Sequence, residues 1–304
     1  MARASLNSLV LPEGGPLRRD HAVPEGSREP SYDARYDFQT LAYDAVHLPQ
    51  FGAICLICPR LFNLGYVLRR GRFPGEGGRH RILMVTRLRR FVEVWLWAPR
   101  GARRLTFHHG DLELTCAVTS QDRETFRGLK AGVTLSRNND LAWIRDWVRF
   151  HVRQHGLEAM LFFDNGSDLY GLEDIEDVLA GVRGLGTFRV VSAPHPFGPM
   201  GRKPHAFRSN FLQPALLNLA RVRFLSRAKA VLQADIDELF VPKNDQTVFD
   251  AALASPFGYA LFDGSWRYAP RIAGDRPRHA DLVFQDPQSA RPETKYCIRP
   301  KSLF

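Results

Sequence analysis

The stretch Val231-Leu-Gln-Ala-Asp-Ile-Asp-Glu-Leu-Phe240 places three carboxylates directly after a short apolar run. The apolar residues at 230–232 predict a buried strand. Asp235, Asp237 and Glu238 follow it, and burying such charges without partners would be strongly unfavourable. At a strand end that faces a cleft, Asp235 and Asp237 point to the same side of an extended chain. This pattern suits a hard divalent cation such as Mg²⁺ or Mn²⁺, and the alternative is a solvated acidic turn.

Upstream of this stretch, predicted strands and helices alternate. Apolar strands are predicted at residues 132–136, 159–163 and 188–192, and helices at residues 141–155, 172–182 and about 207–227. A short helix at 247–254 and strands at 259–268 and 281–284 are predicted to follow. Strands that alternate with helices indicate an α/β fold, in which a mostly parallel sheet carries helices on both faces.

The first part of the chain has a different texture. Residues 1–40 are rich in Pro, Gly, Arg and Glu and predict a disordered or loosely attached leader. Residues 41–125 are predicted to form a small, mainly β N-terminal domain with an antiparallel β unit, because alternating runs at 82–86, 91–97 and 112–118 are separated by turn residues. The α/β domain is then expected at residues 126–304.

The chain is basic, with 304 residues and a formal net charge of +10. Much of the excess lies before residue 105. The arginines concerned are Arg69, Arg70, Arg72, Arg79, Arg81, Arg87, Arg89, Arg90, Arg100, Arg103 and Arg104. Such a face attracts nucleic acid, anionic lipid headgroups or phosphorylated substrates, unless it is a solvated basic surface.

Neither the cysteines nor the first residues indicate secretion. Cys55 and Cys58 have the spacing of a metal or redox pair, but their apolar neighbours and the lack of a second Cys or His pair favour core cysteines. The N-terminal residues lack the apolar run of a signal peptide, and the apolar run at 51–62 is too short to span a bilayer. We therefore expect a cytoplasmic protein, either free or peripheral to the inner membrane.

Polar residues follow each of three predicted strands. They are Ser136-Arg137-Asn138-Asn139-Asp140, Asp164-Asn165-Gly166-Ser167-Asp168 and Asp235-Ile236-Asp237. Because the carboxyl ends of parallel strands meet at one edge, these groups are expected to form one ligand site, with Ser136, Asn139 and Asn165 among its substrate-binding residues. Asp164 would accept hydrogen bonds from a base or ribose, and Arg137 would neutralise phosphate. Asp235 and Asp237 would hold a metal that bridges a diphosphate. Asp164-Asn-Gly is also a good simple turn.

The same segments carry a resemblance to a known family. They are Asn139-Asp140-Leu-Ala-Trp-Ile-Arg-Asp-Trp147-Val-Arg-Phe-His151, Phe163-Asp164-Asn165-Gly166-Ser167, Asp235-Ile-Asp237-Glu238-Leu-Phe240, Gln213 with Asn218, and Lys295-Tyr-Cys-Ile-Arg-Pro300. In these segments the chain resembles the bacterial GT-A glycosyltransferases related to families 2 and 92, from about residue 130 to about residue 300. The resemblance implies a GT-A fold, a nucleoside-diphosphate-sugar donor, Mn²⁺ or Mg²⁺ at Asp235 and Asp237, and a substrate-binding role for Gln213.

The chain departs from the family pattern at several positions. Asp140 stands where the family more often has Glu, and Asp168 stands where it more often has Thr. Leu239 separates Glu238 from the aromatic residue that usually follows directly. Similar proteins continue beyond the Arg-Pro, whereas this chain stops at Phe304. We therefore expect a C-terminal truncation of the domain, or a last metal contact from elsewhere.

An inverting transfer needs a carboxylate base that takes the proton of the acceptor hydroxyl. Glu238 directly follows the metal pair and is one candidate. Asp263 is the other, in Phe262-Asp-Gly-Ser-Trp266, although it also suits a simple turn. Trp266 either stacks on a sugar ring or fills the core.

The sequence therefore predicts a metal-dependent glycosyltransferase, an enzyme that moves a sugar from a nucleoside diphosphate to a glycan, polysaccharide or lipid-linked acceptor. A contact with an anionic membrane is a further expectation, and nucleic acid is not an expected partner of such an enzyme. Three alternatives stay open. A nucleotidyltransferase would usually carry a Gly-rich loop after its first strand, and Ser136-Arg-Asn-Asn lacks one. The others are a basic module that binds nucleic acid or anionic membrane, and an inactive glycosyltransferase-like protein.

Overall fold

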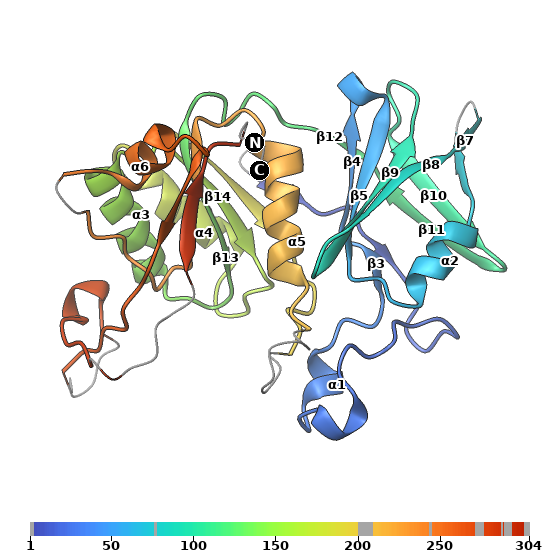
Figure 1. Ribbon diagram of the computed structural model, residues 1–304, viewed down its shortest axis with the longest axis horizontal. Coiled ribbons are helices and arrows are strands. Elements are labelled where there is room, and N and C mark those ends of the chain that lie inside the picture. The colour runs from blue at the N-terminus through green and yellow to red at the C-terminus, as the bar shows by residue number, and fades with distance from the viewer. Residues whose placement is uncertain are drawn as a thin grey trace. The chain divides into compact units, whose positions relative to one another are not determined.

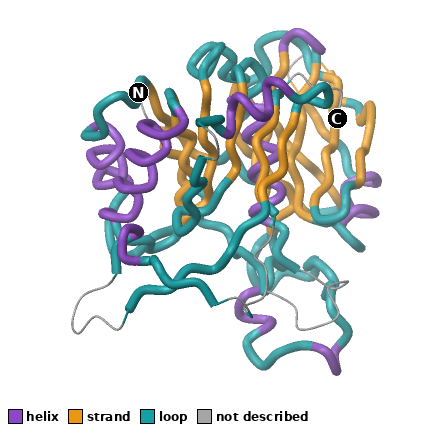
Figure 2. The backbone as a smooth tube through the Cα atoms, turned by 60° about the vertical axis from the view of Figure 1, so that its left-hand side comes forward, coloured by secondary structure: helices purple, strands orange, loops and turns teal. Residues whose placement is uncertain are grey.

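The computed structural model describes residues 3–75, 78–199, 209–242, 245–270, 277–286, 288 and 294–300. Strands account for most of the regular structure of these residues (Figure 2). The chain divides into two compact units. Unit 1 comprises Met1–Ala4, Arg123–Ser192 and Phe224–Phe304, and unit 2 comprises Ser5–Asp122 and Ala193–Arg223.

Unit 1 is built on a seven-stranded sheet in the order β1-β15-β14-β13-β16-β18-β17. Its strands are β1 (Arg3–Ser5), β13 (Lys130–Ser136), β14 (Ala159–Asp164), β15 (Thr187–Ser192), β16 (Ala230–Gln233), β17 (Tyr259–Phe262) and β18 (Lys295–Ile298). Strands β13 to β16 are parallel to one another, and β18 is antiparallel to both β16 and β17. The predicted α/β class with a mostly parallel sheet is therefore confirmed.

Three helices cover this sheet: α3 (Leu141–His155), α4 (Leu172–Ala180) and α6 (Val248–Ala254) (Figure 1). Their buried residues Trp147, Ile175 and Phe249 join one core cluster with Met160 of β14 and Leu232 of β16. Because register aligns Met160 and Leu232 with the same residue of β13, all three helices lie on one face of the sheet. The expectation of helices on both faces does not hold for the described helices of unit 1.

The longest of these helices begins and ends as its sequence dictates. The side chain of Asp140 accepts a hydrogen bond from the amide of Ala142 at 2.7 Å and so caps the first turn. Gly156 adopts a left-handed conformation with φ of 64° and ends the helix. This helix matches the predicted range, and it carries Trp147 beneath the acidic turn described below.

Unit 2 contains a five-stranded sheet in the order β12-β4-β5-β9-β8 and three two-stranded sheets, β2-β3, β6-β7 and β10-β11. Its strands are β2 (Leu9–Val10), β3 (Thr40–Ala42), β4 (Asp44–Leu48), β5 (Ala53–Pro59), β6 (Phe73–Gly75), β7 (Gly78–His80), β8 (Ile82–Arg87), β9 (Phe91–Trp97), β10 (Arg104–His109), β11 (Leu112–Ala117) and β12 (Thr119–Ser120). Its helices are α1 (Tyr32–Arg35), α2 (Leu64–Arg70) and α5 (Leu212–Leu219). Apart from β12 with β4, the pairs are antiparallel.

Residues 3–40, predicted to be a disordered or loosely attached leader, belong to the fold. Leu9 and Leu11 join the main core of unit 2. The side chain of Arg19 is fully buried, where it bonds the backbone carbonyls of Asp37 and Thr40. Composition misled the prediction, because apolar residues scattered among Pro and Gly still fill a core when distant strands surround them.

The predicted border between residues 125 and 126 lies close to the change of unit at Arg123, but the changes of unit at 4/5, 192/193 and 223/224 were not predicted. Helix α5 was assigned to the α/β domain, whereas it packs on β5 and β9 of unit 2. It is also shorter than the predicted range 207–227, because it passes into a π-helical turn at Ala220–Phe224. Residues 207 and 208 of that range lie outside the described residues.

Two further predictions concern a strand at 281–284 and the four cysteines. The strand predicted at 281–284 is absent from the described residues there, where a short 3-10 helix at His279–Asp281 precedes an isolated bridge between Tyr268 and Phe284.

The cysteines are free and buried, as expected for core residues. Among the described helices, none has the length and apolar character needed to cross a membrane.

Candidate functional site

One edge of the unit 1 sheet collects the polar residues that the sequence singled out. Register aligns Ser136 at the end of β13 with Asp164 at the end of β14. On the other side of β13, Gln233 ends β16 level with Val133, so the chain reaches the same edge at Asp235. Since β14 and β16 flank β13, the two strands run about 10 Å apart across the sheet. The predicted convergence of three parallel strand ends on one edge is therefore confirmed.

Two more segments reach this edge. Strand β17 runs in the same direction as β16, because both are antiparallel to β18. Its end at Phe262 is paired with Lys295, the first residue of β18. Asp263 follows β17 directly and is exposed, and its carboxylate lies 3.5 Å from the Thr294 hydroxyl. The second candidate base therefore lies on the same edge as the acidic turn.

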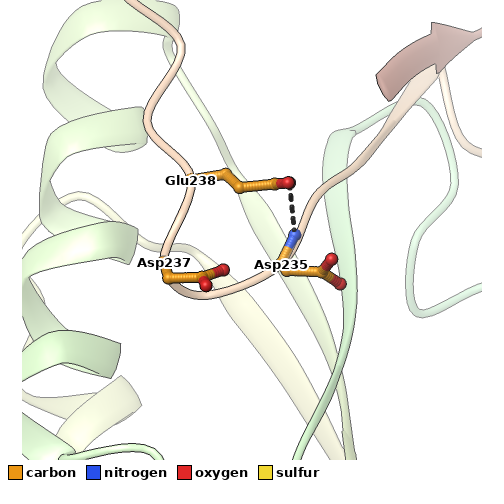
Figure 3. Close-up of side chains that lie close together, drawn as sticks. All are labelled: Asp235, Asp237 and Glu238. Atoms are coloured by element: carbon orange, nitrogen blue, oxygen red, sulfur yellow. Dashed lines mark hydrogen bonds between the residues drawn. The ribbon is translucent and has the colours of Figure 1, made fainter. Parts of the chain in front are cut away.

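The acidic turn is a compact structure with its own hydrogen bonds. The amide of Asp235 donates to the Glu238 carboxylate at 3.0 Å, and the amide of Glu238 donates to the Asp235 carbonyl at 3.1 Å. One ligand oxygen from each of Asp235, Asp237 and Glu238 lies within 4.8 Å of the others (Figure 3). This group is called the acidic triad below. Three carboxylates at this spacing could hold a metal ion.

Buried side chains fix the backbone of this turn from below. The indole of Trp147 donates to the Glu238 carbonyl at 2.8 Å. The Nε2 atom of His279 lies 2.7 Å from the Ile236 carbonyl, and Ile236 itself is buried. These two contacts, at the carbonyls of Ile236 and Glu238, hold the backbone of the turn and so help to position its carboxylates. His279 had no signal in the sequence, because its partner is a backbone atom far away along the chain.

Lys295 neutralises part of the triad. Its ammonium lies 2.6 Å from the Asp235 carboxylate and 3.1 Å from the Glu238 carboxylate. Burial alone would lower the pKa of Lys295, but the hydrogen bond and the negative charges of Asp235 and Glu238 outweigh it and raise that pKa. Burial raises the pKa of Glu238, although the Asp235 amide and the Lys295 charge act against it. The sequence assigned no role to Lys295.

Asp237 differs from its two neighbours. Its side chain is exposed and accepts no hydrogen bond from the part of the chain that the structure describes. The donor set as a whole, all carboxylate oxygens, is the kind that Mg²⁺ and Mn²⁺ prefer. The triad therefore fits a divalent cation chemically, with Asp237 ready to bind it and with Asp235 and Glu238 shared with Lys295.

Asp164 is committed to its own turn. It is almost fully buried, and its Oδ2 atom accepts from the amides of Gly166 and Ser167, each at 3.1 Å. Its Oδ1 atom accepts from the Ser167 hydroxyl at 2.5 Å. A carboxylate has about four lone-pair sites, so one further donor can still be accepted. The structure thus supports the simple-turn interpretation of Asp164, and contact with a nucleoside stays a prediction.

The loops after β13 and β14 are locked together. Asn138 has a positive φ of 55°, and its side chain donates to the Asp168 carboxylate at 2.8 Å and accepts from the Asp168 amide at 3.0 Å. The side-chain amide of Asn139 donates to the Ser136 hydroxyl at 2.8 Å, and the backbone amide of Asn165 donates to the Ser136 carbonyl at 2.8 Å. Of the five substrate-binding candidates on this edge, Ser136, Asn139, Asp164 and Asn165 therefore build the loops themselves.

The remaining candidates stand apart from this network. Arg137 is exposed, and its guanidinium lies 3.8 Å from the Asp168 carboxylate, a long contact that leaves it open to an anion. Gln213 lies on α5, which belongs to unit 2, so its substrate-binding role stays a prediction. Trp266 follows β17 and is 47% exposed, which excludes the core-filling interpretation.

Comparison of the chain with protein-family models gives no match, and no curated protein matches it either.

Proposed function

We propose that the chain is a metal-dependent glycosyltransferase of the GT-A type, which moves a sugar from a nucleoside diphosphate to a glycan, polysaccharide or lipid-linked acceptor. One observation carries this proposal. The ends of β13, β14, β16 and β17 share an edge on which the acidic triad and Lys295 lie together. Such an edge is where open α/β sheets bind their ligands.

The charges on this edge suit a departing diphosphate. Negative charge grows on the leaving group as the glycosidic bond breaks, and fixed cations next to it lower the barrier. Asp235 and Asp237 would hold a divalent ion, which would supply positive charge to stabilise the leaving diphosphate. Lys295 would supply a second positive charge from β18, 2.6 Å from Asp235. Arg137, exposed after β13, would supply a further positive charge to a phosphate.

Of the two candidate bases, Asp263 suits the role better than Glu238. The Glu238 carboxylate is already bonded to the Asp235 amide and to Lys295, so it holds the turn and the lysine in place. Asp263 is exposed, and within the described ranges its carboxylate has only the long contact with the Thr294 hydroxyl. Trp266, three residues further on and half-exposed, offers an indole face on which a sugar ring of the acceptor could stack.

The test is a thermal-shift titration of the full chain with nucleoside diphosphates, with and without Mn²⁺. A ligand that binds only the folded protein at a hundred times its Kd adds about 2.7 kcal/mol of stability, a readily measured rise in Tm. We expect that rise only with both components present. Asp237→Asn should abolish it while leaving the Tm of the free protein unchanged, because the exposed Asp237 side chain makes no hydrogen bond or ion pair with a described residue.

Asp177→Asn is the matched control, since Asp177 is exposed on α4 and its loss removes the same charge away from the edge. Stabilisation by a nucleoside diphosphate in the absence of metal would remove the metal from the proposal. If none of the nucleoside diphosphates changes the Tm under either condition, the glycosyltransferase proposal fails.

The position of Lys295 favours a second candidate, a glycosyltransferase-like protein that binds a nucleotide without a metal and does not turn it over. An ammonium that already neutralises Asp235 and Glu238 takes part of the place of a divalent ion. This candidate predicts the metal-independent Tm rise named above, together with no release of nucleoside diphosphate from any nucleotide sugar.

A further inference from the structure

The edge strand of the unit 2 sheet exposes large apolar side chains. Strand β8 is last in the sheet order and pairs with β9 alone. Leu83 is 58% exposed, Met84 is 51% exposed, and Leu88 in the following turn is 44% exposed. Exposed apolar residues are ordinary when scattered singly, but three within six positions of one strand and its turn form a patch.

An irregularity in the strand creates this patch. The register of β8 shifts between Ile82 and Met84, since Ile82 pairs with Leu96 and Met84 with Trp95. Leu83 is therefore an extra residue that has no partner on β9 and turns away from the core. Ile82 and Val85, on either side, pack against the core cluster of unit 2. The bulge leaves two consecutive residues, Leu83 and Met84, exposed between the partly buried Ile82 and Val85.

Positive charge surrounds the patch. Arg79, Arg81, Arg87 and Arg89 are exposed, and their side chains make no ion pair or hydrogen bond with any residue of the described ranges. The sequence from 78 to 92 contains no Asp or Glu. The next acidic residue, Glu93, is buried and bonded by Asn218 and Arg221. Among the described residues near β8 in the sequence, no unpaired carboxylate therefore cancels the field of these arginines.

We infer that Arg81, Leu83, Met84, Arg87, Leu88 and Arg89, the β8 surface, dock unit 2 on an anionic lipid bilayer. Apolar side chains enter the boundary between headgroups and acyl chains, and arginines beside them bind lipid phosphate while their stems stay apolar. Trp97 adjoins the β8 surface, because its amide donates to the Arg81 carbonyl at 2.8 Å, and its indole is 45% exposed. Tryptophan is enriched at membrane interfaces for the same reason.

The charges argue against the two other occupants. A second copy that paired with β8 in antiparallel fashion, centred on Met84, would bring Arg81 opposite Arg87, and like charges directly opposite each other destabilise a strand pair. Nucleic acid would use the arginines but would leave Leu83, Met84 and Leu88 without an apolar partner. An anionic bilayer satisfies both kinds of side chain. The inference does not depend on the function proposed for unit 1.

The test is co-sedimentation of the full chain with vesicles of phosphatidylcholine alone and of phosphatidylcholine with phosphatidylglycerol. We expect binding to the second kind only, with an affinity that falls as salt is added. The double variant Arg87→Glu/Arg89→Glu should lower that affinity tenfold or more, since each basic residue at the surface strengthens binding several-fold. Leu83→Ser/Met84→Ser should weaken binding while keeping the charge.

Arg103→Glu/Arg104→Glu is the matched control, because it reverses two exposed charges on the β10 side of the same unit. An equal loss in this control would mean that net charge alone drives binding, and the inference would be overturned. Unchanged binding by Leu83→Ser/Met84→Ser, tighter binding to duplex DNA than to the vesicles, or a dimer in solution that Arg87→Glu/Arg89→Glu dissociates would overturn it too. Circular dichroism of each variant checks that the fold is retained.

Discussion

Lys295 and the acidic triad form a charge cluster whose side chains differ in exposure to solvent and in the contacts they make. Lys295 is 13% exposed at its side chain, Asp235 is 34% exposed, and Glu238 is 27% exposed. Solvent and salt screen an ion pair at this depth less than one at the surface. The Lys295 ammonium therefore stabilises the acidic turn in addition to interacting with a bound ligand. Asp237 alone faces solvent with its carboxylate uncommitted.

Replacing Lys295 by Met separates these effects. The variant leaves two half-buried carboxylates without a counter-charge, so we expect a loss of about 1–2 kcal/mol in the free energy of unfolding. Mn²⁺ should then stabilise the variant more than the parent protein, because the cation no longer shares its ligands with an ammonium. Urea unfolding with and without Mn²⁺ measures both quantities.

Lys229→Met is the control for that experiment, since Lys229 is exposed and lies just before β16. Equal stabilisation of Lys295→Met and the parent protein by Mn²⁺ would contradict the picture of a shared site.

His151 makes the stability of the chain depend on pH. It is fully buried on α3, its Nδ1 atom lies 2.8 Å from the Trp147 carbonyl, and burial lowers its pKa to about 3. The unfolded state has an ordinary histidine pKa of about 6.5 and therefore binds a proton at pH values at which the folded state does not. This contribution to stability is complete above about pH 6.5 and declines by about 1.4 kcal/mol per pH unit down to about pH 3.

His151→Phe removes this titration while keeping a ring in the core. Between about pH 6 and pH 4.5, the parent protein should lose about 2 kcal/mol more than the variant, by the same linkage. Other buried histidines titrate equally in both proteins, so the difference isolates His151. Urea unfolding across this pH range gives the two slopes, and parallel slopes would refute the assignment.

The elements that carry the site are joined by side chains from their loops. The loop after β13 and the loop after β14 meet at Asn138, whose φ of 55° is in the left-handed region. Besides the Asp168 contacts, its backbone amide donates to the Ser167 hydroxyl at 2.9 Å. Asparagine is one of the few residues with a side chain that tolerates this conformation, and here its amide group also bridges two strand ends.

Asn138→Gly and Asn138→Ala distinguish conformation from bonding. Both lose the side-chain hydrogen bonds to Asp168, but only alanine adds the left-handed strain, so it should be the less stable by about 1 kcal/mol. Both should speed amide exchange at Asp168 and Leu169, whose amides face the lost carbonyl oxygen at 3.0 and 3.4 Å. Equal stability of the two variants would show that the backbone relaxes.

Strand and helix positions in unit 1 were predictable because their signals are local. Each of these signals covers only a few neighbouring residues, as in the apolar runs of β13, β14 and β15 and the cap of α3 at Asp140. Pairing over long distances had no such signal. Lys295 reaches the triad only because β18 inserts between β16 and β17, and Leu9 and Leu11 are buried only because β3 brings them into a core. The site at the carboxyl ends of the parallel strands could therefore be predicted from the sequence, but the contact of Lys295 with that site could not.

At the scale of the whole molecule, the chain changes unit four times, at residues 4/5, 122/123, 192/193 and 223/224. A fragment of residues 126–304, the predicted domain, would therefore keep α5 without the strands β5 and β9 on which it packs. Leu212, Leu216 and Leu219 are buried in the intact protein and would be exposed in the fragment. We expect this fragment to aggregate or to unfold without cooperativity.

Near-ultraviolet circular dichroism and limited proteolysis of the fragment, next to the full chain, test this expectation. A fragment that unfolds in one sharp transition, with the full chain's resistance to protease over β13 to β16, would show that unit 1 folds without its partner segments.

The sheet order of unit 1 also bears on how the protein is made. The first strand to leave the ribosome, β1, pairs with β15, which begins about 180 residues later in the chain of 304. Strand β13 pairs with β16, which follows it by about a hundred residues. Unit 2 is complete once Arg223 has emerged, before β16, β17 or β18 leaves the ribosome. During translation, unit 2 can therefore be complete while the sheet of unit 1 still lacks three strands. We expect that incomplete sheet to be the part of the protein that chaperones bind in the cell.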